Sequence, residues 1–181
     1  ALLPEMNKDI ARLQLIAERF SKIGSAPELT EQDVCPIVQR VGAYFRHRTS
    51  SRVTITVSVP QQAVTARVNA PLLEWVFENL CKNAIDAMQG AGNLTLTLKE
   101  SAIVEKRKRY LRVEVSDTGK GIAKNHFQRV FKPGFTTKRR GWGLGLSLAK
   151  RIVEEYHHGR IYVLASEVGQ GTTFAVDIEQ C

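Results

Sequence analysis

Several features are scarce or missing in this chain of 181 residues. Its three cysteines, Cys35, Cys81 and Cys181, have no CxxC spacing, which argues against a disulfide scaffold and a cysteine-rich zinc site. No run of about 18 apolar residues occurs, so no membrane-spanning helix is predicted. The first residues lack a basic start followed by an apolar stretch, so we expect no signal peptide. We therefore expect a cytoplasmic chain with reduced thiols, and any membrane anchor of the parent protein in segments outside it.

The residues that are present suit a folded domain with a basic surface. Hydrophobic residues make up 43% of the chain, enough to build a core, so wholesale disorder is not expected. Lysine and arginine outnumber aspartate and glutamate by 26 to 18, a net charge of +8. Such a balance suits nucleic acid, an anionic membrane or a nucleotide as partner. We interpret the basic run Lys106–Arg109 as a solvated hairpin tip, because aromatic residues for base stacking do not alternate with it.

Apolar spacing predicts two parts. Residues 5–24 have a heptad pattern, so we assign residues 1–26 to an N-terminal helix and residues 27–181 to an α/β domain. The segment Glu100–Arg109 is expected to connect two antiparallel strands. The elements expected in the domain are helices over 33–47, 71–88 and 144–158, and strand pairs over 53–59 and 64–68, 94–98 and 111–115, and 161–165 and 174–178. This order predicts a two-layer α/β sandwich with a mixed sheet.

A stripe of polar residues runs along the helix expected over 71–88. Asn79, Asn83 and Asp86 are spaced by four and three residues, which places them on one helix face. Amide and carboxylate oxygens there could hold a hard divalent cation, best beside a nucleotide that adds phosphate oxygens. Alternatively, the two asparagines only hydrogen-bond a neighbouring loop.

Two glycine-rich segments are candidates for binding a nucleotide. In Asp117–Ile122, the glycines let the backbone pass close to a flat ligand, and Asp117 can accept a hydrogen bond from an exocyclic amine. Gly141–Ser147 opens a helix, where free N–H groups and the helix dipole attract anions. An ordinary turn and a flexible linker are the alternatives.

A basic segment, Phe127–Arg140, lies between these two. Its Pro133-Gly134 pair cannot continue a helix, and the position beside a glycine-rich loop suggests a lid over phosphates. Lys138 is the strongest candidate for contact with a terminal phosphate. A surface loop with incidental charge is the alternative.

The segments ENLCKNAIDAM, DTGKGI, FKPGFTTK and GWGLGL occur in the order of the N, G1, F and G2 boxes. Together they resemble the nucleotide-binding catalytic domain of sensor histidine kinases of two-component systems, within the GHKL superfamily of gyrase, mismatch-repair and chaperone ATPases. The resemblance covers residues 30–178. It implies the Bergerat fold, with helices on one face of the sheet, and ATP and Mg²⁺ as ligands. It also implies transfer of the γ-phosphoryl group to a histidine on an upstream helix, and then to the receiver domain of a response regulator.

Further expectations come from the same resemblance. Residues 5–24 are similar to the second helix of the dimerisation and phosphotransfer hairpin, which implies a homodimer in the full-length protein and no nucleic-acid partner. Asn79 and Asn83 would bind Mg²⁺, Asn79 and Lys138 would serve catalysis, and Asp117 would bind the adenine amine. The implied nucleotide-binding set is Asn79, Lys82, Asn83, Asp117, Gly119, Gly121, Ile122, Phe131, Thr136, Thr137, Lys138, Gly141, Gly143, Leu144, Gly145, Leu146 and Thr172.

Departures from the family pattern limit these expectations. Trp142 stands where a small residue is usual, and Asp86 stands where many members have lysine, so Asp86 is given no phosphate role. None of the four histidines is followed by the acidic-x-basic pattern of the phosphoacceptor, so we expect that helix upstream of Ala1 and the chain to be a fragment. Asn79 replaces the water-activating glutamate of the hydrolysing relatives, which favours a kinase. A related ATPase, a serine-kinase anti-sigma factor, a non-catalytic basic binding module and a coiled-coil scaffold with a degenerate site remain alternatives.

Overall fold

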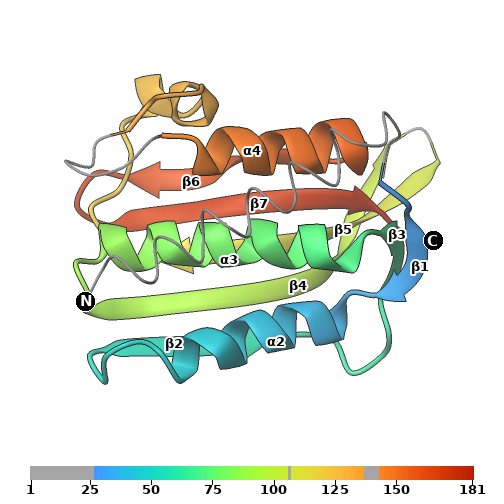
Figure 1. Ribbon diagram of the computed structural model, residues 1–181, viewed down its shortest axis with the longest axis horizontal. Coiled ribbons are helices and arrows are strands. Elements are labelled where there is room, and N and C mark those ends of the chain that lie inside the picture. The colour runs from blue at the N-terminus through green and yellow to red at the C-terminus, as the bar shows by residue number, and fades with distance from the viewer. Residues whose placement is uncertain (1–26, 106, 137–142) are drawn as a thin grey trace.

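The computed structural model describes residues 27–105, 107–136 and 143–181. The helix expected over 5–24 lies outside these residues. The described residues form a five-stranded mixed sheet with helices on one face, as predicted (Figure 1). In spatial order its strands are β2 (Val53–Ser58), β4 (Gly92–Glu105), β5 (Lys108–Asp117), β7 (Gly171–Glu179) and β6 (Arg160–Glu167). The pair β2–β4 is parallel and the other neighbours are antiparallel.

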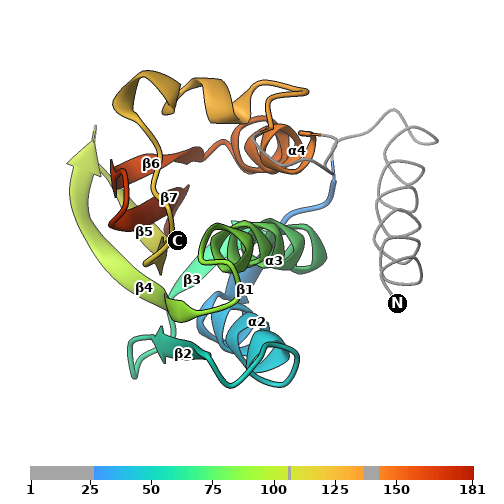
Figure 2. The ribbon, with the colours of Figure 1, turned by 90° about the vertical axis from the view of Figure 1, so that its left-hand side faces the viewer.

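Three α-helices of the described chain cover one face of this sheet (Figure 2). They are α2 (Cys35–Arg46), α3 (Ala70–Ala87) and α4 (Gly145–Arg151), the last continuing into a π-helical segment, η3 (Ile152–Tyr156). Two short 3-10 helices, η1 (Lys124–His126) and η2 (Arg129–Phe131), lie between β5 and α4 in the chain. Within the described ranges, no helix combines the length and apolar character needed to cross a membrane.

The central helix α3 is stabilised by an N-cap residue and by an apolar face that packs in the core. The Asn69 side chain accepts the N–H of Leu72 at 3.2 Å, and Pro71 suits the first helical turn. Phe77 and Leu80 are fully buried against the sheet, and burying one such side chain contributes about 1.5–3 kcal/mol. Asn79 and Asn83 of the same helix are only half-buried.

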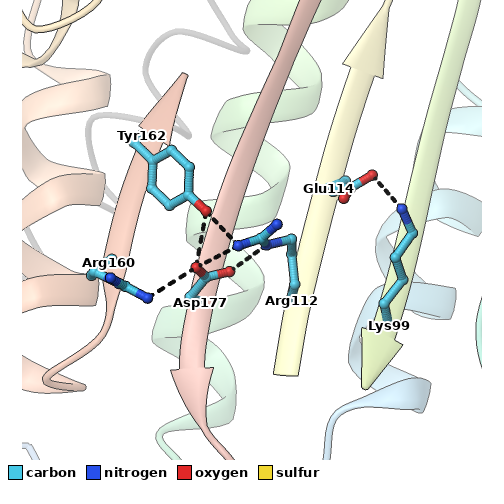
Figure 3. A network of polar contacts seen from close by, with 6 residues as sticks. All are labelled: Lys99, Arg112, Glu114, Arg160, Tyr162 and Asp177. Atoms are coloured by element: carbon cyan, nitrogen blue, oxygen red, sulfur yellow. Dashed lines mark hydrogen bonds and ion pairs between the residues drawn. The ribbon is translucent and has the colours of Figure 1, made fainter. Parts of the chain in front are cut away.

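The opposite face of the sheet carries a polar network (Figure 3). Asp177 on β7 is 0% exposed and accepts two hydrogen bonds from the Arg112 guanidinium, at 2.7 and 3.0 Å. The Tyr162 hydroxyl donates to the same carboxylate at 3.0 Å, and Arg160 forms an ion pair at 3.6 Å. Because both oxygens of this buried carboxylate have partners, the network joins β5, β6 and β7 without an uncompensated charge.

One strand pairing differs from expectation. The strands over 53–59 and 64–68 do not pair with each other: β2 lies beside β4, and β3 (Thr65–Val68) pairs with an unexpected strand, β1 (Thr30–Asp33). The sequence TEQD has no apolar alternation, because β1 is almost wholly exposed. Its position is set instead by Asp33, whose Oδ1 accepts N–H bonds from Cys35 and Val64 at 3.0 and 3.1 Å.

The expected connection Glu100–Arg109 is also shorter than predicted. Strand β4 runs on to Glu105 and β5 begins at Lys108, with a register shift between Ser101 and Val104. This part of the hairpin extends past the helices in Figure 1. Arg107 at the tip has φ of +67°.

Candidate functional site

Strand β5 ends at a buried carboxylate. Asp117 is 6% exposed and lies opposite Thr172 of β7. Its Oδ1 accepts the N–H of Gly119 at 2.7 Å. Burial raises the pKa of Asp117 above its ordinary value, and hydrogen bonds from the N–H groups of Gly119 and Thr172 oppose that rise. The strand end and the following turn therefore hold an acceptor in a fixed orientation inside the fold.

The turn after Asp117 fits only because it contains glycine. A β-carbon on Gly119 would lie 2.6 Å from the carbonyl carbon of Ala87 at the end of α3. A β-carbon on Gly121, where φ is +74°, would lie 2.0 Å from the carbonyl oxygen of Glu167. The turn is thus enclosed between the end of α3 and the β6–β7 turn.

Two residues of this cluster were not expected from the sequence. A β-carbon on Gly171 would lie 2.0 Å from the carbonyl oxygen of Asp117. The hydroxyl of Ser166, on β6, accepts the N–H of Ile122 at 2.7 Å and lies 2.8 Å from the hydroxyl of Thr172. Gly171 could have been found from the sequence, because it directly precedes the candidate Thr172. No sequence pattern distinguishes Ser166.

A second group of predicted residues lies where α3 meets α4. Asn79 is half-buried, and its Nδ2 is buried with no hydrogen-bond partner among the described residues. A β-carbon on Gly145 would lie 2.5 Å from the Asn79 Oδ1, so the amide faces the first turn of α4. A buried donor left without a partner costs about 1–3 kcal/mol. One turn further along α3, Asn83 is half-buried, while Lys82 is exposed.

The start of α4 is joined to the segment after η2. The N–H of Gly134 donates to the carbonyl of Gly143 at 3.0 Å, and both glycines have positive φ, +80° and +63°. Leu144 is 52% exposed and Leu146 is half-buried. Phe131 is buried instead, with its ring 6.0 Å from that of Phe174. Thr136 is exposed, and the other lid and loop candidates, Thr137, Lys138 and Gly141, lie outside the described residues.

Most of the described candidates therefore fall into two groups linked by α3, and Lys82, Phe131 and Thr136 are not among them. The first group, called the base end below, comprises Asp117, Gly119, Gly121, Ile122, Gly171 and Thr172. The second, called the phosphate end, comprises Asn79, Asn83, Gly143, Leu144, Gly145 and Leu146. A depression of about 410 Å³ next to Ile122 is bordered by residues 122–124 and 166–168, and neither Asp117 nor Asn79 lines it.

Comparison with known proteins identifies the fold and its family. Residues 68–180 match the family described as histidine kinase-, DNA gyrase B-, and HSP90-like ATPase. Sporulation kinase E of Bacillus subtilis is 39% identical over 106 residues, covering 59% of this chain and 13% of that protein. The adaptive-response sensory kinase SasA of Synechococcus elongatus is 32% identical over 179 residues, covering 95% of this chain and 44% of that protein. The chain thus spans less than half the length of these relatives.

Solved structures agree with the sequence relatives. The catalytic domain of the histidine kinase ThkA has a TM-score of 0.73 and 26% identity, covering 85% of this chain and 97% of that one. Full-length ShkA in complex with AMPPNP has a TM-score of 0.77 and 25% identity, covering 99% of this chain and 38% of that one. The chain therefore belongs to the family of histidine kinase-, DNA gyrase B- and HSP90-like ATPases, as the ATP-binding domain of a sensor histidine kinase.

Proposed function

We propose that this domain binds Mg-ATP between its base end and its phosphate end and passes the γ-phosphoryl group to a histidine of a dimerisation hairpin. From there the group would pass to the receiver domain of a response regulator. The observation that carries the proposal is the carboxylate of Asp117, buried at the end of β5 and fixed by the N–H of Gly119 at 2.7 Å. Residues 1–26 are proposed as the end of that hairpin, and residues 27–181 as the catalytic domain.

The base end has the chemistry to select adenine. A carboxylate has lone pairs beyond the one that Gly119 uses, and the 6-amino group of adenine is a donor suited to them. Guanine has a carbonyl oxygen at that position, which would face the carboxylate without a proton between them. The glycine turn at Gly119 and Gly121, with Ile122 and Thr172, would form the wall against which the flat base lies.

The phosphate end suits a magnesium ion and the triphosphate. Carbonyl oxygens of asparagine are hard ligands that Mg²⁺ accepts beside phosphate oxygens and water, so Asn79 and Asn83 would hold the ion. The Asn79 amide supports this role, because its Nδ2 lacks a hydrogen-bond partner in the described structure. A flip of the amide by about 180° would place the carbonyl oxygen at the position that Nδ2 now occupies, where it could bind the ion. Bound there, Mg²⁺ would neutralise charge on the phosphates. The remaining proposed contacts come from Lys82, Phe131, Thr136, Thr137, Lys138, Gly141, Gly143, Leu144, Gly145 and Leu146.

Phosphoryl transfer, rather than hydrolysis, is the reaction that these residues favour. The amide of Asn79 cannot deprotonate water, and Glu78 is displaced by about 100° around the helix axis. Transfer of a phosphoryl group requires positioning and charge neutralisation more than covalent help from the protein. The attacking imidazole is proposed to come from the hairpin, because none of the four histidines in this chain is followed by the phosphoacceptor pattern.

The proposal is tested by combining calorimetry with a transfer assay. We expect the domain to bind Mg-ATP, to hydrolyse it slowly, and to label a separately supplied histidine-bearing hairpin from γ-labelled ATP. The label should be acid-labile and absent when the hairpin histidine is replaced by glutamine. Rapid hydrolysis by the domain alone, abolished by Glu78→Gln, would instead make it an ATPase.

A further inference from the structure

We propose that Ser166 is a positioning residue for the base end, holding the turn after Asp117 against β7. This inference rests on the proposed function, because it concerns how the same site recognises adenine. The hydroxyl of Ser166 donates to the carbonyl of Gly171 at 2.9 Å and accepts the N–H of Ile122 at 2.7 Å. It also lies 2.8 Å from the hydroxyl of Thr172. A hydroxyl has one proton and two lone pairs, so these contacts use its full hydrogen-bonding capacity.

The contacts of Ser166 reach both sides of the base end. Ile122 closes the glycine turn that Asp117 opens, and Thr172 is the residue opposite Asp117 in the β5–β7 pairing. One hydroxyl therefore joins the end of the turn to the strand that backs the carboxylate. The neighbouring contact between these segments, from the N–H of Gly169 to the carbonyl of Lys120 at 2.7 Å, uses backbone atoms alone. Ser166 is thus a link that a side-chain substitution can remove.

A strand irregularity places Ser166 in this position. The β6–β7 register shifts between Val163 and Ala165, and after the shift Ser166 lies opposite Thr172. Val163 pairs with Phe174, so continuous pairing would have placed Ala165 opposite Thr172 instead. Bulges next to binding sites redirect side chains in this way. Without the extra residue, the hydroxyl would lie one position away from the pair that it now joins.

Removing the hydroxyl should loosen the turn relative to Asp117 while leaving the phosphate end unchanged. We expect Ser166→Ala to weaken ATP binding about tenfold, the effect of losing one partly buried hydrogen bond of ordinary strength, and to reduce the preference for ATP over GTP. Binding of magnesium tripolyphosphate, which has no base, should be unaffected. Weaker ATP binding with unchanged tripolyphosphate binding would distinguish a role in positioning the base from a general loss of structure.

Ser116 supplies a matched control. Its hydroxyl lies 2.8 Å from that of Thr173, between β5 and β7 in the same sheet, one residue before Asp117, and that contact does not involve the turn. We expect Ser116→Ala to retain the affinity for ATP, and Ser166→Thr to restore it by supplying a hydroxyl. Ser166→Cys, similar in size but a weak hydrogen-bonding partner, gives the same readout if the alanine variant does not fold.

The outcomes are measured by calorimetry with ATP, GTP and tripolyphosphate. If the unaltered domain binds ATP and Asp117→Asn does not, while Ser166→Ala keeps both the affinity and the ATP preference, the positioning role is wrong and the proposed function stands. Equal losses in Ser116→Ala and Ser166→Ala would also overturn it. An unaltered domain that binds tripolyphosphate as well as ATP would count against the proposed adenine site itself.

Discussion

The base end and the phosphate end of the proposed site differ in how completely they are formed without a ligand. At the base end, Asp117 is buried with its carboxylate hydrogen-bonded, and Gly121 and Gly171 leave no space between neighbouring backbones. At the phosphate end, Nδ2 of Asn79 has no partner in the described part of the chain, and Leu144 is 52% exposed. One end is built to its final shape, and the other retains polar groups that a ligand would satisfy.

This difference matches the chemistry of the two parts of ATP. A purine is flat and neutral, so a rigid pocket can discriminate it by shape and by one acceptor, and ordering the pocket in advance reduces the cost of binding. A triphosphate is flexible and highly charged, and it arrives with its own metal ion. An amide without a partner, as at Asn79, raises the energy of the free domain, and under the proposed function the bound ligand would satisfy it.

The largest effect is expected from filling the space between the strands of the base end. Gly171→Ala would place a β-carbon 2.0 Å from the carbonyl oxygen of Asp117, at φ of +129°. We expect a loss of about 3 kcal/mol or more in the free energy of unfolding, together with loss of ATP binding. Gly169→Ala, in the same turn with φ of +83° and open space around it, should lose about 1 kcal/mol. Urea unfolding measures the free energy of unfolding of both variants. Equal losses would show that the close packing around Gly171 does not determine the effect.

The next effect separates binding from stability at Asp117. Asp117→Asn replaces the acceptor proposed to face adenine, so we expect ATP affinity to fall about 100-fold, as for a hydrogen bond to a charged group. Tripolyphosphate binding should change far less, because it depends on the phosphate end. Calorimetry with the two ligands decides between this expectation and a general loss of the site.

The same variant should be more stable than the unaltered domain at neutral pH. Burial raises the pKa of Asp117 in the folded state, so the folded domain holds this proton more tightly than the unfolded chain does. Stability therefore falls as the pH rises from the ordinary aspartate pKa through the raised one. Asparagine has no such titration, so its melting temperature should exceed that of the unaltered domain at pH 7, and the difference should shrink toward about pH 4.

A smaller effect is expected at the phosphate end. Asn79→Ala removes a buried donor that has no partner, but it also removes packing contacts of the side chain, so the two effects oppose each other and the free energy of unfolding should change by less than about 1 kcal/mol. Affinity for Mg-ATP should fall about tenfold, while affinity for ATP in the presence of a chelator stays the same. Asn125→Ala, at an exposed position on η1, is the control for both measurements. An equal loss of metal-free binding would place Asn79 against the nucleotide rather than the ion.

Much of this arrangement was predictable because it follows local patterns. Alternating leucines predicted β4, apolar spacing predicted α3, and the turn Asp117–Ile122 was expected at a strand end. The parts that were missed depend on contacts between residues far apart in the chain. Strand β1 is positioned by the carboxylate of Asp33 rather than by apolar alternation. Ser166 reaches its partners only because of a register shift that no local sequence pattern predicts.

The smallest effect is expected at the far ends of the two helices that carry the phosphate end. His157 follows η3 and is 4% exposed; its Nδ1 bonds to the carbonyl of Ile152 at 2.9 Å, and its Nε2 accepts the N–H of Asn69 at 3.1 Å. The ring is therefore neutral in the folded domain, and burial lowers its pKa below the ordinary value. The unfolded chain takes up the proton first, so stability is complete above about pH 6.5 and declines as the pH falls toward the lowered pKa.

We expect a measurable loss of stability between pH 6.5 and pH 5, because the unfolded chain takes up this proton in that range before the folded domain does. His157→Gln has no titration in that range and should flatten the profile, while lowering stability at neutral pH because both ring contacts change. Asp117 opposes the decline, because its own raised pKa makes the folded domain more stable as the pH falls. Unfolding measured on the double variant with Asp117→Asn would therefore be nearly independent of pH across this range. A profile that keeps its slope in the double variant would show that neither Asp117 nor His157 sets the response to acid.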